Sequence, residues 1–200
     1  GVQTCALPIF EYDDVANDQR KAIYESRNQL LESADISERI GSIRREVINA
    51  FVTQHIPPES LEEQWDIDGL EKTLMAELQL DLPVKQWLAD ESSLDEDQLR
   101  ARIVEFADRK YQDKIKPFEA EPIRHFERTL MLQSIDSHWR EHLAALDHLR
   151  QGIHLRSYAQ KTPVQEYKKE AFELFGLMLE MINTEVTRVL MTVQFRSEAE

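Results

Sequence analysis

The chain has 200 residues, 42% of them hydrophobic and 31% charged, with only five glycines and seven prolines. Because apolar residues recur at helical spacing between the charged ones, with few helix breakers, we predict an all-α fold. The net charge of −14 at pH 7 argues against nucleic acid as a partner, since 24 lysines and arginines face 38 carboxylates and cannot form a domain-sized basic surface.

The single cysteine, Cys5, excludes an internal disulfide and a cysteine-rich zinc site, and it fits a reducing compartment. No segment approaches the roughly 18 consecutive apolar residues that a membrane-spanning helix needs. The first ten residues lack the positively charged region of a signal peptide. We therefore expect a cytoplasmic protein.

In chain order, residues 1–10 contain Pro8 and no charged residue, so we expect an unrelated or disordered lead-in. Residues 11–34 begin with acidic residues, which favour a helix N-terminus, and continue with charges between apolar positions. This pattern predicts a helix with one moderately apolar side. Such a helix cannot bury enough surface alone and needs a packing partner.

Residues 35–117 predict several further helices. Asp35 and Glu38 suit the start of the first, whose apolar stripe runs to Phe51 before Pro57 stops it.

The same spacing of a capping residue and a glutamate recurs twice. Ser60 and Glu63 precede a short helix, and Ser93 and Glu96 precede a longer one that ends near Pro117. A brief apolar segment separates these two helices.

The charge changes near Pro117. Residues 35–117 hold 19 acidic and 11 basic residues, a net charge of −8, whereas residues 118–200 hold 13 and 10, a net charge of −3. This shift predicts a boundary between an acidic inserted subdomain at 35–117 and a helical hairpin at 118–195, which a loose tail follows at 196–200.

Two long helical patterns form the predicted hairpin. Each carries apolar residues at steps of three and four, so the two faces should pack antiparallel along a seam. Gly152 can end the first arm in the left-handed conformation, and Thr162 can cap the second, with Pro163 at its first position and Gln165 completing a capping box. The seam residues that we expect to pack are Trp139, Leu143 and Leu146 in the first arm and Phe172, Phe175 and Leu179 in the second.

The loop between the arms differs in composition from the rest of the chain. From His148 to Lys161 there is no acidic residue, while basic residues and histidines occur among apolar residues and Tyr158. The stretch is either a locally basic and aromatic contact surface or a solvated turn whose tyrosine packs back on the arms.

His138, Glu141 and His142 match H-x-x-E-H, in which two histidines one helical turn apart bind zinc and the glutamate acts as base. No downstream signature identifies a third ligand, so histidines on a helix surface explain the match better. No glycine lies in a G-x-x-x-x-G-K context, and we expect no nucleotide binding or hydrolysis by this chain itself.

Three stretches resemble the SecA family, the motor ATPases of bacterial preprotein translocation. The run LRQGIHLRSYAQKTPVQEYKKEAFELF, preceded by SIDSHWREHLAALDH, is similar to the C-terminal part of the family. EYDDVANDQRKAIYESRNQLL resembles its long scaffold helix, and IPPESLEEQWDIDGL resembles its helical wing. The resemblance runs from Glu11 to Phe195 and leaves out residues 1–10.

The resemblance implies a long scaffold helix at 11–34, a helical wing at 35–117 and further scaffold with a two-helix finger at 118–195. It implies that the finger tip contacts the translocating preprotein at a SecYEG-type membrane channel, where the protein is peripherally associated with the inner face of the plasma membrane. The ATPase domains, with ATP and Mg²⁺, lie outside this chain, for which the resemblance implies no catalytic, nucleotide-binding or metal-binding residue and no cofactor. By its motif, the contact residue that the resemblance implies is Tyr158. Together with the composition of the loop, this predicts a contacting tip of Tyr158, Ile153, His154, Leu155 and Arg156.

Two other hypotheses stay open from the residues alone. One is a stand-alone helical adaptor without a role in transport, and the other is a zinc hydrolase that uses the H-x-x-E-H residues.

Overall fold

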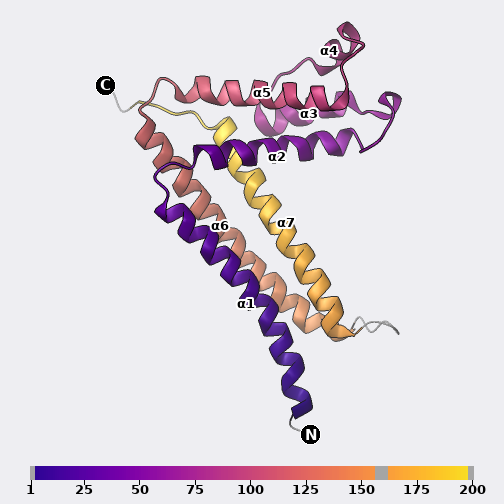
Figure 1. Ribbon diagram of the computed structural model, residues 1–200, viewed down its shortest axis with the longest axis vertical. Helices are drawn as coiled ribbons and strands as arrows, with labels where there is room; N and C mark the ends of the chain where they lie inside the picture. Colours follow the sequence, from indigo (N-terminus) through magenta and orange to yellow (C-terminus); the bar gives the residue numbers. More distant parts are fainter. Residues whose placement is uncertain (1–2, 156–161, 198–200) are drawn as a thin grey trace. The chain divides into compact units, whose positions relative to one another are not determined.

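The computed structural model describes residues 3–155 and 162–197, with side chains from residue 11 onward. Within these ranges the chain forms α-helices and short 3-10 helices and no strand, which confirms the all-α prediction (Figure 1). In chain order the elements are α1 (Gln3–Glu32), α2 (Ser37–His55), η1 (Glu62–Gln64), α3 (Ile67–Leu78), α4 (Val84–Asp90), α5 (Glu96–Ile115), α6 (Ala120–Gly152), η2 (Ile153–Leu155) and α7 (Pro163–Thr192).

The first helix is longer than the sequence pattern predicts. It begins at Gln3 rather than at Glu11, so the backbone of residues 3–10 is helical. Pro8 lies in the second turn of α1, where it removes one helical hydrogen bond without ending the helix.

The N-caps of α3 and α5 are aspartates rather than the predicted serines. The Asp66 carboxylate accepts a hydrogen bond from the Gly69 N–H at 3.0 Å. Asp95 accepts from the Gln98 N–H at 2.8 Å, and the Gln98 side chain accepts in return from the Asp95 N–H at 3.1 Å. A capping box is therefore present at α5, two residues later than predicted, because aspartate and glutamine serve this geometry as well as serine and glutamate.

The chain divides into two compact units, which we describe separately. Unit 1 comprises Gly1–Ala34 and Arg128–Ile182, and unit 2 comprises Asp35–Glu127 and Asn183–Glu200. The helices α6 and α7 each contribute residues to both units.

In unit 1, α1 lies along α6 (Figure 1). Arg27 on α1 forms an ion pair with Asp136 on α6, with 3.0 Å between Nε and Oδ1, and Arg128 donates to the Ser33 carbonyl at 2.7 Å. The apolar face of α1 is buried at Tyr12, Ile23 and Leu30. The first helix thus has the packing partner that its limited apolar face requires.

In unit 2, α2 packs against α3 and α5, and α3 contacts α4 (Figure 1). The apolar interior of this unit consists largely of aliphatic side chains from these helices. Among its fully buried members are Ile48, Val52, Leu70, Leu74, Leu78, Leu99 and Ile103.

A polar network is buried in unit 2 around Glu127, whose exposed fraction is 0%. Its carboxylate accepts from the Tyr111 hydroxyl at 2.7 Å and from the Arg124 guanidinium at 2.6 Å. The Arg44 guanidinium lies 4.8 Å from the Tyr111 ring centroid and forms an ion pair with Asp108 at 2.7 Å. Burial raises the pKa of Tyr111, and the adjacent carboxylate raises this pKa further.

The chain after α7 packs within unit 2 as far as Phe195. The ring centroid of Phe195 lies 5.4 Å from that of Phe126 and 5.9 Å from that of Phe118. Lys114 donates to the Leu190 carbonyl at 2.8 Å, near the C-terminal end of α7. Part of the predicted tail, residues 198–200, lies outside the described residues.

Within the described ranges, no helix combines the length and the apolar character that crossing a membrane requires.

Candidate functional site

The first arm of the predicted finger is the part of α6 that belongs to unit 1. Its apolar face is buried at Trp139 and Leu146, while Leu143 is half-buried. These positions follow the three-and-four spacing of one helix face, so the sequence pattern identifies the inward side of this arm.

The second arm has a different inward face from the one that the sequence pattern predicts. Phe172 is 77% exposed and Leu179 is 40% exposed, so these two predicted seam residues do not pack into unit 1, and Phe175 is half-buried. The buried positions of α7 in this unit are Tyr167, Ala171, Met178 and Ile182.

The difference between the predicted and the observed buried face of α7 has a simple physical cause. The inward and predicted faces of the second arm differ by one residue over its first turns, and both carry apolar residues at helical spacing. Periodicity alone cannot choose between two adjacent apolar stripes. The face that is buried contacts α1: the Gln19 side chain donates to the Ala171 carbonyl at 3.1 Å, and Tyr12 packs against Tyr167.

The base of the loop is an aromatic and aliphatic cluster. Ile153 is 1% exposed and packs with Tyr12, Leu146, Leu149, Tyr167 and Ala171. The rings of Tyr12 and Tyr167 meet edge to face with their centroids 4.8 Å apart. Ile153 therefore anchors the loop to the arms, and its side chain is not on the exposed surface.

The loop emerges from this cluster at residues 154 and 155. His154 is exposed and lies edge-on to the Tyr12 ring, with 6.4 Å between ring centroids. Leu155 is 88% exposed, the most exposed large apolar side chain among the described residues. Arg156 and Tyr158, the other two predicted tip residues, lie outside the described residues.

Of the two helix ends that border the loop, the sequence predicts the cap at Thr162 correctly but not the conformation of Gly152. Gly152 is the last residue of α6 and does not take the predicted left-handed conformation, because the chain continues directly into the 3-10 turn of η2. At the other end, the Thr162 hydroxyl accepts from the Gln165 N–H at 3.2 Å. The predicted cap of the second arm is therefore present, with Pro163 at the first helical position.

Part of the basic charge near the loop is compensated by α1. Arg150 forms an ion pair with Asp13 at 3.1 Å, and its guanidinium lies 5.6 Å from the Tyr12 ring centroid. Sequence reasoning missed Tyr12 and Asp13 as neighbours of the loop, because these contacts join residues more than 130 positions apart and leave no local signal.

A buried hydrogen-bonded link joins the helices of unit 1. Gln19 donates through Nε2 to the Ala171 carbonyl, and its Oε1 lies 2.6 Å from His142 Nε2. Since the amide oxygen can only accept, this arrangement places a proton on His142 Nε2. The imidazole is buried beside the rings of Trp139 and Phe175, and burial lowers the pKa of His142.

These contacts bear on the H-x-x-E-H match. The Nε2 atom of His142 is engaged by Gln19 in the interior, and His138 Nδ1 lies 3.8 Å from a Glu141 carboxylate oxygen. Across the ranges that the structure describes, no group of three or more His, Cys, Asp or Glu side chains is arranged to hold a metal ion. The alternative prediction, that both histidines lie on the helix surface, is wrong for His142. This side chain is buried and forms a hydrogen bond with Gln19 on α1.

Comparison with known proteins identifies this architecture. Residues 8–194 match the family described as SecA Wing and Scaffold domain. The chain is 58% identical over 192 residues to the protein translocase subunit SecA of Methylobacillus flagellatus, and 57% identical over 190 residues both to the protein translocase subunit SecA 1 of Nitrosospira multiformis and to the protein translocase subunit SecA of Chromobacterium violaceum.

These alignments cover 96%, 95% and 95% of this chain and 21% of each relative, so the chain spans about a fifth of the length of the curated relatives that it matches. The family match extends over nearly the whole chain and includes all the helices from α2 to α7. The chain therefore belongs to the SecA family, in which it corresponds to the wing and scaffold domain.

Proposed function

We propose that this chain is the wing, scaffold and two-helix finger of a preprotein translocase, and that the finger tip contacts the polypeptide during transport. In this proposal Tyr158 is the principal contact residue, and His154, Leu155 and Arg156 extend the contact surface. The ATPase domains, which would bind ATP and Mg²⁺, belong to the part of the longer protein outside this chain. The tip would act at a SecYEG-type channel, with the protein peripherally associated with the membrane.

The main support for the proposal is the difference in solvent exposure between the first and the last residue of η2. Ile153 is held in the cluster at the base of the loop, whereas Leu155, two residues later, is almost fully exposed. A firmly anchored base with apolar and cationic groups beyond it suits a surface that contacts many different sequences, because such contacts depend on shape and apolar area rather than on specific side-chain pairing.

The names of the relatives favour this proposal over a stand-alone adaptor, since they describe subunits of a protein translocase. Unit 1 also supplies a means of transmitting force to the tip. Its arms are joined to α1 by the Gln19 link and by the Arg150–Asp13 ion pair, so a displacement of α1 would be passed to the base of the loop.

The test is Tyr158→Ala in the full-length protein, assayed by ATP-driven transport of a preprotein into membrane vesicles. We expect the transport rate to fall about tenfold, the factor that corresponds to a loss of ~1.4 kcal/mol of contact energy. Tyr24→Ala is the matched control, because Tyr24 is an exposed tyrosine that lies on α1, outside the loop. Equal rates for the two variants, with helical content unchanged, would contradict the proposed role of the tip.

A further inference from the structure

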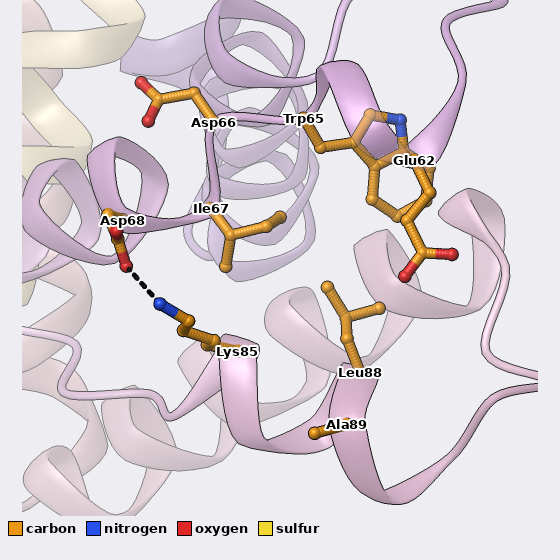
Figure 2. Close-up of a pocket in the computed structure, with 8 residues that line it drawn as sticks. All are labelled: Glu62, Trp65, Asp66, Ile67, Asp68, Lys85, Leu88 and Ala89. Carbon is orange, nitrogen blue, oxygen red and sulfur yellow. Dashed lines mark ion pairs between the residues drawn. The ribbon is translucent and has the colours of Figure 1, made fainter.

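A pocket of about 400 Å³ lies in unit 2, between the segment around η1 and α4. Figure 2 shows Ile67, Leu88 and Ala89 around the hollow, with Lys85 on one side and Glu62 on the other. Trp65 forms a further wall, and Asp66 and Asp68 complete the lining. We call this hollow the wing pocket. Its apolar walls and charged rim are the combination expected of a site for an amphipathic side chain.

The carboxylates of the rim are not equivalent. Asp68 lies 3.5 Å from the Lys85 ammonium, so these two charges offset each other (Figure 2). The Asp66 carboxylate accepts from His55 at 3.1 Å and from the Gly69 N–H, and these hydrogen bonds lower the pKa of Asp66. Glu62 forms no ion pair with any described residue. Lys85 offsets the charge of Asp68, but the hydrogen bonds to Asp66 leave its charge in place. The rim therefore carries a net negative charge, and Glu62, which lies beside an indole ring, is its carboxylate without an ion pair to a described residue.

We propose that the wing pocket binds a lysine or arginine side chain of the translocating polypeptide, together with an adjacent aliphatic residue. The cation would lie near the Glu62 carboxylate and the face of Trp65, where ion-pair and cation–π attraction combine. The aliphatic neighbour would cover Ile67 and Leu88. The inference rests on the proposed function, because that function supplies an extended polypeptide as the occupant.

The size of the pocket favours a transient polypeptide over a permanently docked domain. Interfaces between domains of one chain commonly bury about 600–1,500 Å², whereas this hollow accommodates one or two side chains. The net charge of −8 over residues 35–117 also favours a cationic segment, which such a field attracts at long range.

The first test uses the 200-residue chain labelled with ¹⁵N and two acetylated, amidated peptides, Leu-Arg-Leu-Leu and Leu-Glu-Leu-Leu. The chain has three tryptophans, and Trp65→Phe identifies the indole signal of Trp65. The Trp65 indole N–H is buried and has no hydrogen-bond partner among the described residues, so its resonance reports changes at the pocket wall. We expect a saturable shift of this signal with the arginine peptide, no shift of Trp139 in unit 1, and no shift with the glutamate peptide.

Matched variants test the recognition itself. Glu62→Gln should weaken binding of the arginine peptide about fivefold, the upper range for one exposed ion pair, whereas Glu63→Gln, next to it in η1 but outside the pocket, should leave binding unchanged. Ala89→Leu should abolish binding by filling the pocket, and Ala76→Leu, at an exposed site on α3, should not. Equal shifts with both peptides, or equal affinities of Glu62→Gln and Glu63→Gln, would overturn the inference.

A second test separates the polypeptide from other occupants in the full-length protein. With Ala89→p-benzoylphenylalanine, illumination during transport should cross-link the preprotein, and cross-links only within the same protein would overturn the inference. These results are independent of the finger tip. A normal transport rate of Tyr158→Ala would remove the tip proposal without changing peptide binding to the wing pocket, and an unresponsive Trp65 signal would remove only the wing pocket.

Discussion

At the scale of single residues, the most consequential polar group is Glu127. It is fully buried, and both of its described hydrogen-bond donors, Tyr111 and Arg124, come from side chains. Glu127→Ala would leave the guanidinium and the hydroxyl without their acceptor in the interior of unit 2. Because breaking a buried ion pair by removing one partner typically costs about 3 kcal/mol or more, we expect a loss of that size in the free energy of unfolding, measured by urea denaturation.

Glu105→Ala is the matched control for this prediction. Glu105 is also paired with an arginine, Arg109, at 2.9 Å, but both side chains are largely exposed on α5. Exposed pairs contribute little, so this variant should stay within about 0.5 kcal/mol of the parent chain. Similar losses for the two variants would show that the Glu127 network contributes no more than a surface ion pair.

Lys114 is a second residue whose environment leads to a testable prediction, in this case about the reactivity of its amine. Burial, with a smaller contribution from Lys110, lowers the pKa of Lys114 from 10.5 to about 8. At pH 8 about half of this amine is therefore uncharged and nucleophilic, whereas a lysine with the ordinary pKa is almost wholly protonated. We expect limiting acetic anhydride at pH 8 to acetylate Lys114 ahead of the exposed Lys72, as measured by mass spectrometry of peptides. The preference should vanish in concentrated urea, and equal labelling of the two lysines in the folded chain would contradict the lowered pKa.

The lowered pKa of Lys114 also determines how the free energy of unfolding changes with pH. Between pH 8 and 10.5 the unfolded chain binds more protons at Lys114 than the folded chain does, so this residue makes the fold more stable as the pH rises across that window.

At the scale of elements, α7 shows which of two apolar faces the fold uses. Met178 is buried in unit 1, and Phe172 is mostly exposed. Met178→Ala should lower the free energy of unfolding by about 2 kcal/mol, since it leaves a cavity among packed side chains. Phe172→Ala should change it by no more than about 0.5 kcal/mol. Urea denaturation of the two variants checks the assignment, and the reverse order would restore the face predicted from the sequence.

The link between α1, α6 and α7 predicts a response to acid. Burial lowers the pKa of His142 below 6.5, so the unfolded chain binds more protons than the folded chain as the pH falls through 6.5. The contribution of His142 to stability is therefore complete above that pH and declines below it. We expect thermal denaturation between pH 7.5 and 5.5 to show a smaller decline for His142→Gln than for the parent chain. His148→Gln, at an exposed position on the same helix, should decline as the parent does.

Sequence patterns predict most of the elements but not the contacts that select their faces. The helix class, the cap at Thr162 and the inward face of the first arm follow from local spacing, because these features depend on neighbours within one or two turns. The face of α7, the anchoring of Ile153 and the burial of His142 depend on α1, which lies more than 120 positions away in the chain. Gln19 carries no local sign of this role, since a lone glutamine on a polar helix resembles an exposed residue.

At the scale of the whole molecule, the chain forms two compact units, and α6 and α7 contribute residues to both. Compact units with their own interiors commonly open as separate cooperative units in native-state exchange. We therefore predict two distinct opening free energies from hydrogen exchange, one for buried amides of unit 1 and one for those of unit 2. Along α6 the change should occur between Glu127 and Arg128.

Two single variants turn this prediction into a discriminating experiment. Met178→Ala should lower the opening free energy of unit 1, read at Ile135 and Leu146, and leave Leu99 and Ile103 of unit 2 unchanged. Tyr111→Phe removes a hydroxyl that donates to Glu127 and should do the reverse, by about 1–2 kcal/mol. If both variants lowered the opening free energy equally at all four residues, the two units would open as one cooperative fold, coupled through α6 and α7. In that case a change in unit 1 would lower the stability of unit 2, whereas separate opening would let either unit change while the other stays intact.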